Sequence, residues 1–400
     1  MKRFSLIALL LLSILTLKAQ QIIISDSAVI SLITCSPGEE VYSKFGHTAI
    51  RINDSQHGVD LVFNYGIFSF ETENFYYKFI KGETDYQLGI YDTRYFLPEY
   101  AQRNSQVWEQ VLNLTVIEKR KLINSLLNNY EPQNRTYRYN FVFDNCSTRP
   151  RDKIIAALQG YIKFQPSLES KTFRQWVGVY VGTDTWLKFG IDIVFGMDAD
   201  LPANTNESMF LPENLMFEFQ TAQIHTPNGQ IRKLVSEKKI LVTKNELIDQ
   251  HESWIFKPLT FTLLLLILGI PLTIWDIKGK KRHLKFFDTF LLALTGIGGV
   301  IAFYLMFLSL HPLVKSNLNL LWLNPINLVL AVLIWIKPLR KALFYYQILN
   351  ILLLIGALFS FALSTQVFNT AAFPIIVLLL MRSTSWFDLT KKKIFKTRKI

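Results

Sequence analysis

The residues of this chain best suited to covalent chemistry are a cysteine and a histidine. The cysteine, Cys146, directly precedes an apolar-periodic helix that we expect to begin near Lys153. Ser147 or Thr148 can cap this helix, and Pro150 is acceptable only in a first helical turn. The sequence therefore predicts that Cys146 lies at a helix N-terminus.

This position favours the thiolate form of Cys146, which is the nucleophilic form. The positive end of the helix dipole and the guanidinium groups of Arg149 and Arg151 would both stabilise a negative charge on sulfur. The alternatives are a buried structural cysteine and a disulfide bridge to Cys35, the other cysteine of the chain. Composition alone does not decide between a nucleophile and a structural thiol.

His47 is the histidine best placed for catalysis. It follows Gly46 and opens an apolar, strand-like run, which places an imidazole at the edge of a sheet where backbone can approach closely. The other five histidines lie in polar, turn-like or juxtamembrane sequence, which is typical of the surface. We therefore predict that His47 is the base that pairs with the cysteine.

A third group should orient the imidazole. If the chain forms a hairpin about Asp54–Asp60, His47 comes opposite the neighbourhood of Asn64-Tyr65-Gly66, so Asn64 is our candidate for this role, with Tyr65 behind it. The alternative is that Asn64 is a loop residue without a catalytic role. Cys35 lies close to the same sheet edge, as a second active-site thiol or as a bridge partner. No His, Asp and Glu cluster has metal-ligand spacing, so we expect no metal and no cofactor.

The elements that must position these residues are those of a mixed domain. Short β-branched runs predict strands over Ser31–Thr34 and Thr48–Asn53, with Leu61–Phe63 as the return strand of the hairpin. Helical spacing predicts a helix over Glu118–Asn129, with Thr115 as its cap and Glu118 completing a capping box, and a second helix over Lys153–Leu158. We expect residues 20–256 to form one α+β domain.

The N-terminus has the three parts of a secretory signal. Met1-Lys2-Arg3 is basic, the run from Phe4 to Leu17 is apolar, and Ala19 is the small residue before the expected cut. We predict a signal peptide over residues 1–19, and the alternative is an uncleaved N-terminal anchor. Either arrangement exports residues 20–256.

The C-terminal part predicts a membrane domain. Four stretches without charge are long enough to cross a bilayer: Pro258–Trp275, Thr289–Leu310, Ser316–Ile336 and Ala342–Met381. The last is long enough for two spans, broken near Ser364–Thr370, so we predict five transmembrane helices within residues 257–388 and a basic tail over residues 389–400. The basic loops then all face the cytoplasm, as the positive-inside rule requires. We expect a multi-pass protein of the bacterial inner membrane, with a periplasmic N-terminal domain and a cytoplasmic C-terminus.

Few polar side chains fall within these spans. Asp288 and Arg382 lie near the cytoplasmic ends, where Arg382 can extend its guanidinium to the interface, so we favour an anchor over a transport path. In the exported part, the aromatic stretches Phe75–Lys81 and Tyr91–Tyr100 suit packing within the domain, and also a face that rests on lipid headgroups.

Composition and charge agree with this organisation. Half of the residues are hydrophobic, 18% are charged and the mean hydropathy is +0.22, values typical of a membrane protein. The net charge of +12 divides into +3 for residues 1–19, −5 for residues 20–256 and +14 for residues 257–400. The basic charge therefore orients the chain in the membrane, and a nucleic-acid partner is excluded.

Several short blocks resemble a known family. They are Ser36-Pro37-Gly38-Glu39, Phe45-Gly46-His47-Thr48-Ala49, Asn64-Tyr65-Gly66, Asn145-Cys146-Ser147-Thr148-Arg149, Gly190-Ile191-Asp192 and Met209-Phe210-Leu211-Pro212. With the multispan C-terminal half, these blocks resemble the bacterial lipoprotein N-acyltransferase family Lnb. The order of histidine before Asn-Cys also resembles the circularly permuted NlpC/P60 (papain-like) proteins, which include the lecithin:retinol acyltransferases. The resemblance implies a permuted NlpC/P60 (papain-like) fold for the exported domain.

The resemblance also implies a two-step acyl transfer. His47 would deprotonate Cys146, and the thiolate would attack an ester carbonyl of a membrane phospholipid to form a thioester. The α-amine of a diacylated lipoprotein's N-terminal cysteine would then take the acyl chain. The backbone N–H groups of Cys146 and Ser147 would bind the oxyanion, and Asn145 is a further orienting candidate.

Two other functions remain open from the sequence. One is a membrane-anchored Cys–His hydrolase, acting as a cell-wall peptidase or as a phospholipase or thioesterase. The other is a non-catalytic envelope scaffold that shares the fold.

Overall fold

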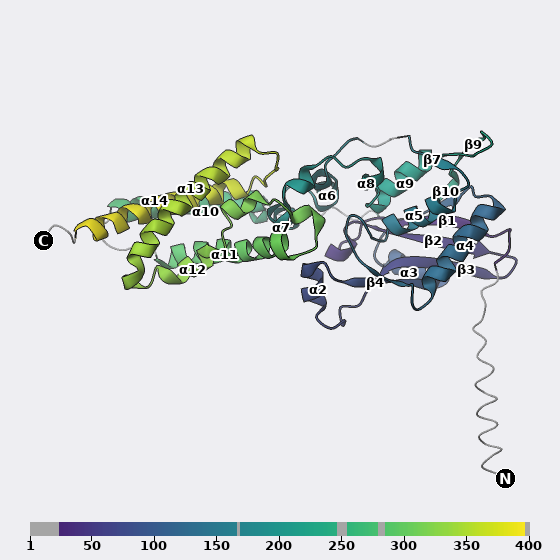
Figure 1. Cartoon of the computed structure of the whole chain (residues 1–400), viewed down its shortest axis with the longest axis horizontal. Helices are drawn as coiled ribbons and strands as arrows, with labels where there is room; N and C mark the ends of the chain where they lie inside the picture. Colours follow the sequence, from purple (N-terminus) through teal and green to yellow (C-terminus); the bar gives the residue numbers. More distant parts are fainter. Residues whose placement is uncertain (1–23, 166–168, 246–253, 279–284, 397–400) are drawn as a thin grey trace, which may run out of the picture.

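A computed structural model describes residues 24–165, 169–245, 254–278 and 285–396 of the chain. Figure 1 shows two parts side by side, a mixed α/β domain built from the N-terminal half and a bundle of long helices built from the C-terminal part. This arrangement confirms the predicted α+β domain followed by an all-α membrane domain. The predicted signal peptide lies outside the described residues.

A seven-stranded antiparallel sheet forms the centre of the N-terminal domain, in the order β10-β5-β1-β2-β3-β4-β6. The predicted hairpin is confirmed, because β2 and β3 pair on either side of its turn. The strands of this sheet are β1 (Val29–Cys35), β2 (His47–Asp54), β3 (Val59–Ile67), β4 (Asp85–Asp92), β5 (Val107–Leu112), β6 (Thr136–Arg138) and β10 (Val235–Val242). A second, three-stranded sheet is formed by β7 (Tyr161–Lys163), β8 (Gln223–His225) and β9 (Ile231–Lys233).

Helices cover both faces of the large sheet. Side chains alternate along a strand, so Ile33, Cys35, Ala49 and Val62 pack together on the face covered by α3, whereas the larger core cluster lies on the opposite face. The helices are α2 (Phe75–Lys81), α3 (Thr93–Gln102), α4 (Val116–Tyr130), α5 (Thr148–Ala157), α6 (Phe173–Val181), α7 (Trp186–Val194), α8 (Thr205–Ser208) and α9 (Pro212–Thr221), with 3-10 turns η1 (Val41–Ser43) and η2 (Met197–Asp200).

The predicted capping box at the start of α4 is confirmed. The Thr115 hydroxyl accepts from the Glu118 backbone N–H at 3.3 Å, and the Glu118 carboxylate accepts from the Thr115 N–H at 2.8 Å. The predicted second helix begins earlier than expected, at Thr148, so that α5 starts two residues after Cys146.

Among its described residues, the membrane domain contains four segments long and apolar enough to cross a membrane, together with a shorter apolar helix at Ala372–Phe387. This agrees with the prediction of about five spans. The elements are η3 (Trp254–Phe256), α10 (Pro258–Lys278), α11 (Lys285–Leu308), η4 (Pro312–Val314), η5 (Leu318–Leu321), α12 (Ile326–Leu333), η6 (Lys337–Leu339), α13 (Arg340–Leu363) and α14 (Ala372–Lys396).

The third span departs from a continuous helix. Its residues fold as the short turns η4 and η5 followed by α12, which has only eight residues. The side chains of Trp322 and Asn319 in this segment are almost completely buried. Irregular backbone at membrane depth is tolerated where protein rather than lipid surrounds it, and here the surrounding helices satisfy that condition.

Arg382 does not extend to the membrane interface, so that prediction is wrong. Its side chain is 4% exposed and bonds Asp288 at 2.6 Å and Asp276 at 2.5 Å, carboxylates carried by α11 and α10. Trp386 donates to Asp288 at 2.7 Å in the same cluster. Opposite charges on neighbouring helices hold the guanidinium inside the bundle.

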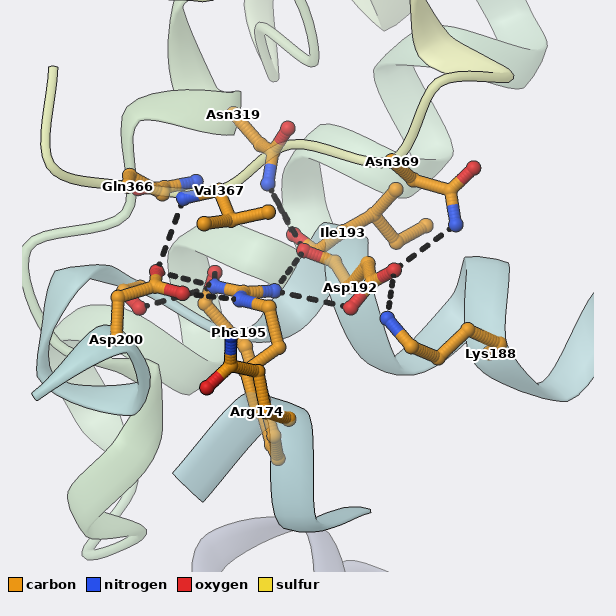
Figure 2. Close-up of polar contacts among 12 residues, drawn as sticks. Arg174, Lys188, Asp192, Ile193, Phe195, Asp200, Asn319, Gln366, Val367 and Asn369 are labelled. Carbon is orange, nitrogen blue, oxygen red and sulfur yellow. Dashed lines mark hydrogen bonds and ion pairs between the residues drawn. The ribbon is translucent and has the colours of Figure 1, made fainter. Parts of the chain in front are cut away.

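A buried polar network joins the two domains (Figure 2). The Arg174 guanidinium, on α6, bonds Asp200 at 2.8 Å and Asp192 at 3.1 Å, and its side chain is 3% exposed. From the membrane domain, the Asn369 side chain donates to Asp192 at 2.9 Å and the Val367 N–H donates to Asp200 at 3.1 Å. The network therefore fixes how the sheet domain sits on the outer ends of the helices.

Candidate active site

His47 and Asn64 lie next to each other at one end of the large sheet. His47 is the first residue of β2, and Asn64 lies near the end of β3, its hairpin partner. The His47 Nε2 atom is 2.6 Å from Asn64 Oδ1. Because an amide oxygen only accepts, Nε2 carries the hydrogen, and Nδ1 keeps the lone pair that a general base needs.

Gly66 lies close to both Cys146 and His47. Regular pairing between β3 and β4 is interrupted between Tyr65 and Ile67, and Gly66 has a φ of +96°. A Cβ atom on Gly66 would lie 3.4 Å from Cys146 Cβ and 3.5 Å from His47 Cε1. The cysteine and the imidazole therefore face the same small space, which the absent side chain leaves open.

The three residues retain some exposed surface. Cys146, His47 and Asn64 are each partly exposed, whereas Thr48 and Asn145, which flank them, are buried. A reactive group must be exposed enough to meet its substrate and be held firmly by its neighbours. Cys146, His47 and Asn64 combine both properties at one end of the large sheet.

Asn145 holds the cysteine at the start of α5. Its Oδ1 atom accepts from the N–H groups of Ser147 at 2.8 Å and Thr148 at 2.9 Å, and its Nδ2 donates to the carbonyls of Phe141 at 2.7 Å and Phe210 at 2.9 Å. The expected cap by the Ser147 or Thr148 hydroxyl is replaced by this amide. Asn145 is thus an orienting residue for the cysteine, and the Ser147 N–H is already engaged.

The Ser147 hydroxyl instead links the start of α5 to the block Met209–Pro212, which is distant in the sequence. Its hydroxyl donates to the Met209 carbonyl at 2.8 Å, beside the Phe210 carbonyl that Asn145 bonds. The same block reaches the histidine strand, because a Cβ on Gly46, where φ is +77°, would lie 3.6 Å from Pro212 and 2.6 Å from the Cys35 carbonyl. The Gly-His, Asn-Cys and Met209–Pro212 blocks therefore meet in space.

The predicted preference of Cys146 for the thiolate form is wrong. Burial raises the pKa of the Cys146 thiol from 9.0 to about 11, although the backbone N–H of Thr48 donates to the sulfur and opposes this increase. Removing water penalises a charged group, and here that penalty exceeds the effect of the helix start.

The two arginines expected to stabilise the thiolate are engaged elsewhere. Arg149 forms a bidentate pair with Asp144, at 2.5 and 2.8 Å, and lies 3.7 Å from the centre of the Tyr137 ring. Arg151 bonds the Asp152 carboxylate at 2.7 Å and the Asn206 carbonyl at 2.7 Å. Their charges are neutralised locally, so neither compensates the buried sulfur.

His47 is also shifted toward its neutral form. Burial lowers the pKa of the imidazole below 6.5, the hydrogen bond to Asn64 opposes this shift, and the positive charge of Arg103 adds to it. The ring stacks against Tyr100 with centroids 6.2 Å apart. At neutral pH the site therefore rests as a neutral thiol beside a neutral imidazole, which suits general-base activation during attack.

Tyr65 points away from the imidazole, whereas Cys35 lies directly opposite His47 where β1 and β2 pair. The Tyr65 hydroxyl donates to Asn129 at 2.7 Å on the opposite face of the sheet, so it does not support the imidazole. Cys35 and Cys146 are both free thiols, which excludes the disulfide alternative in this structure. Burial raises the pKa of Cys35 well above its ordinary value, and its side chain is completely covered.

Sequence reasoning did not assign roles to Gly66, Thr48 or Tyr100. Gly66 stands directly after Asn-Tyr in a strand-like run, and an isolated glycine there is a signal for a bulge or close approach. The Thr48 N–H and the Tyr100 ring gave no signal, since their roles depend on which segments fold over them.

Two family models match the chain. Residues 16–178 match the Lnb N-terminal periplasmic domain, and residues 250–394 match the Lnb transmembrane domain. No curated protein and no solved structure gives a match. Both matches agree with the two domains of the structure, and the first includes His47, Asn64 and Cys146 with the strands β2 and β3 and the start of α5.

Proposed function

Since the chain belongs to the Lnb family of membrane proteins with a periplasmic N-terminal domain, we propose that it is a lipoprotein N-acyltransferase. The donor is a membrane phospholipid, and the acceptor is the α-amine of a diacylated lipoprotein's N-terminal cysteine. The observation that carries the proposal is the placement of Cys146, His47 and Asn64 around one opening, with the tautomer of His47 set by Asn64.

In the first step, the Cys146 sulfur attacks an ester carbonyl of the phospholipid while His47 Nδ1 takes the thiol proton. The tetrahedral intermediate expels the lysophospholipid alkoxide, which receives that proton from His47, and the acyl chain remains on sulfur as a thioester. The neutral resting pair supports this concerted route, because no separate thiolate needs to persist in a poorly solvated site.

In the second step, the lipoprotein amine attacks the thioester carbonyl. His47 Nδ1 accepts a proton from the attacking nitrogen and delivers it to the departing Cys146 sulfur, which regenerates the thiol and leaves an amide. A thioester is more reactive toward amines than the original oxygen ester, so the relay makes the amide accessible at neutral pH.

The developing oxyanion needs donors in both steps. The Ser147 N–H is bonded to Asn145, whereas the Thr48 N–H already points at the Cys146 sulfur. We therefore assign the Thr48 N–H, together with the Cys146 N–H, as the donors that meet the oxyanion.

The attachment of the two domains supports a substrate that resides in the membrane. The Arg174 network joins the sheet domain to the outer ends of the helices, so the cysteine is held at a fixed place beside the bilayer. The proposal includes a signal peptide over residues 1–19, a catalytic domain over 20–256, five spans within 257–388 and a cytoplasmic C-terminal tail.

Mass spectrometry of lipoprotein N-termini tests the activity. Cells that contain the wild-type protein should accumulate triacylated N-termini, and cells that carry Cys146→Ala should retain diacylated ones. Cys35→Ser is the matched control, because Cys35 is a free but fully covered thiol, and it should retain activity.

A reconstituted assay with phospholipid and a diacylated lipopeptide separates the alternatives. Release of free fatty acid without amide product would identify a hydrolase instead of a transferase. Full activity of Cys146→Ala would exclude both enzymatic functions and leave a scaffold.

A further inference from the structure

The short helix α2 presents an apolar face outward. Tyr76, Tyr77, Phe79 and Ile80 are all exposed, from 45% to 70%, whereas Phe75 is buried at 7%. Positions spaced by three and four residues share one side of a helix, so the four side chains form a single face. We call these four residues the α2 face.

The outer end of a membrane span holds this helix in place. The Leu310 N–H donates to the Lys81 carbonyl at 2.8 Å, and the His311 Nε2–H donates to the Phe79 carbonyl at 2.9 Å. Gly82, which ends α2, packs directly against Leu310. Leu310 and His311 lie two and three residues beyond the end of α11, and Figure 1 shows α2 at the side of the sheet domain nearest the helix bundle.

These bonds fix the level of α2 relative to the bilayer. The last turns of α11 expose Phe303, Phe307 and Leu308, and Leu310 beyond them is 58% exposed, as expected for a lipid-facing surface. The α2 face continues this apolar surface past the end of the span. Tyrosine is preferred at the boundary between lipid tails and headgroups, where its ring is apolar and its hydroxyl stays hydrated.

Aromatic rings connect α2 with the catalytic cysteine. Phe75 stacks on Phe68 with centroids 5.6 Å apart, Phe68 stacks on Tyr86 at 4.8 Å, and Tyr86 stacks on Tyr139 at 4.2 Å. Burial raises the pKa of Tyr86 to about 12, and the nearby Cys146 sulfur adds to this effect. The ring series therefore runs from the membrane-facing helix to the neighbourhood of the reacting sulfur.

We propose that the α2 face sits in the outer leaflet of the inner membrane, and that from this position it guides a phospholipid toward Cys146. The second half of this statement rests on the proposed acyltransfer, whereas the first half concerns only where α2 lies. The continuity between the α2 face and the exposed end of α11 favours lipid over a protein partner as the occupant.

Depth measurement by electron paramagnetic resonance tests the position of α2 without any enzymatic activity. The full chain, in a Cys35→Ser/Cys146→Ala background, would be placed in phospholipid nanodiscs with a nitroxide label on Tyr76→Cys. A label on Tyr161→Cys is the matched control, because Tyr161 is 63% exposed on the separate small sheet.

The Tyr76→Cys label should respond more strongly to oxygen than to a water-soluble nickel chelate, and the Tyr161→Cys label should show the reverse. Equal nickel access at both positions would overturn the proposal, because α2 would lie in water. Protection of the Tyr76→Cys label from both relaxants would also overturn it and would indicate a protein contact, such as a second copy of the chain.

The guiding role is tested in the catalytically intact chain. Tyr76→Ser/Ile80→Ser should lower transfer from nanodisc phospholipid by about tenfold or more, because the lost apolar surface weakens lipid contact. Alkylation of Cys146 by iodoacetamide should be unchanged, and Tyr161→Ser should match the wild type in both assays. Unchanged transfer in the double variant would refute guidance, whereas no transfer by the wild type would refute the proposed function and leave the depth result standing.

Discussion

Alkylation of Cys146 over a range of pH tests the central chemical feature of the site, the neutral thiol beside a neutral imidazole. The perturbation is the pH itself, applied to a Cys35→Ser protein so that the reactive thiol is isolated. Tyr161→Cys in the same chain provides an exposed thiol as an internal reference, since Tyr161 lies on the separate small sheet.

The magnitude follows from the shift of the pKa. Raising the pKa of Cys146 from 9.0 to about 11 makes the thiolate about 100-fold rarer at neutral pH than in a thiol of ordinary pKa. Because iodoacetamide reacts with the thiolate, Cys146 should be alkylated about 100-fold more slowly than the reference thiol at about pH 7. The difference should shrink above about pH 9, where at least half of the reference thiol is ionised and its rate begins to level off.

Mass spectrometry of the digested protein measures both rates in one sample. The logarithm of the Cys146 rate should rise by about one unit per pH unit from about pH 6 to about pH 10, without a plateau. His47→Ala should change this alkylation profile little and should abolish acyl transfer, since in the proposed mechanism His47 acts during attack and does not hold a resting thiolate.

A rate plateau between about pH 5 and about pH 8 that disappears in His47→Ala would refute this reasoning. It would show that an imidazolium–thiolate pair exists at rest, and that burial does not dominate the thiol. The two-step mechanism would then begin from a thiolate, as the position at the helix start had predicted from the sequence.

Three further perturbations have defined outcomes. Gly66→Ala should abolish transfer while costing about 1–3 kcal/mol of stability, because φ is +96° and the new methyl group would lie between His47 and the thiol; transfer near the wild-type rate would contradict this. Asn145→Ala should cost at least about 1–2 kcal/mol in thermal unfolding, from the lost cap alone, and should slow transfer. Arg174→Met should destabilise the protein by about 3–5 kcal/mol, because it leaves the buried Asp200 carboxylate without its counter-charge and Asp192 with Lys188 alone; an unchanged melting temperature would show that the network is not needed.

The sequence determined the features that depend on neighbouring residues. Thr115 and Glu118 stand three residues apart before an apolar-periodic run, and the structure has their capping box. Uncharged stretches of bilayer length became the spanning segments for the same reason, because length and local composition set the outcome. The hairpin about Asp54–Asp60 could also be predicted from the sequence, and its two strands bring Asn64 next to His47.

The partners of charged and polar groups could not be predicted in this way where segments distant in the sequence supply them. Arg382 was expected at the membrane interface, but Asp276 and Asp288 arrive from two other helices and pair with it inside the bundle. The cap of α5 was expected from Ser147 or Thr148, whereas the Asn145 amide takes that role because the Phe210 carbonyl, far along the chain, completes its bonds.

The thiol shows this division most clearly. The sequence correctly placed Cys146 at a helix start beside Arg149 and Arg151, and these local features favour the thiolate. The tertiary structure favours the neutral thiol instead, because the segments packed around the sulfur exclude water and so raise the pKa of Cys146. Residue type and spacing thus indicated which groups are candidates for catalysis, and desolvation by distant parts of the chain decided their protonation state at rest.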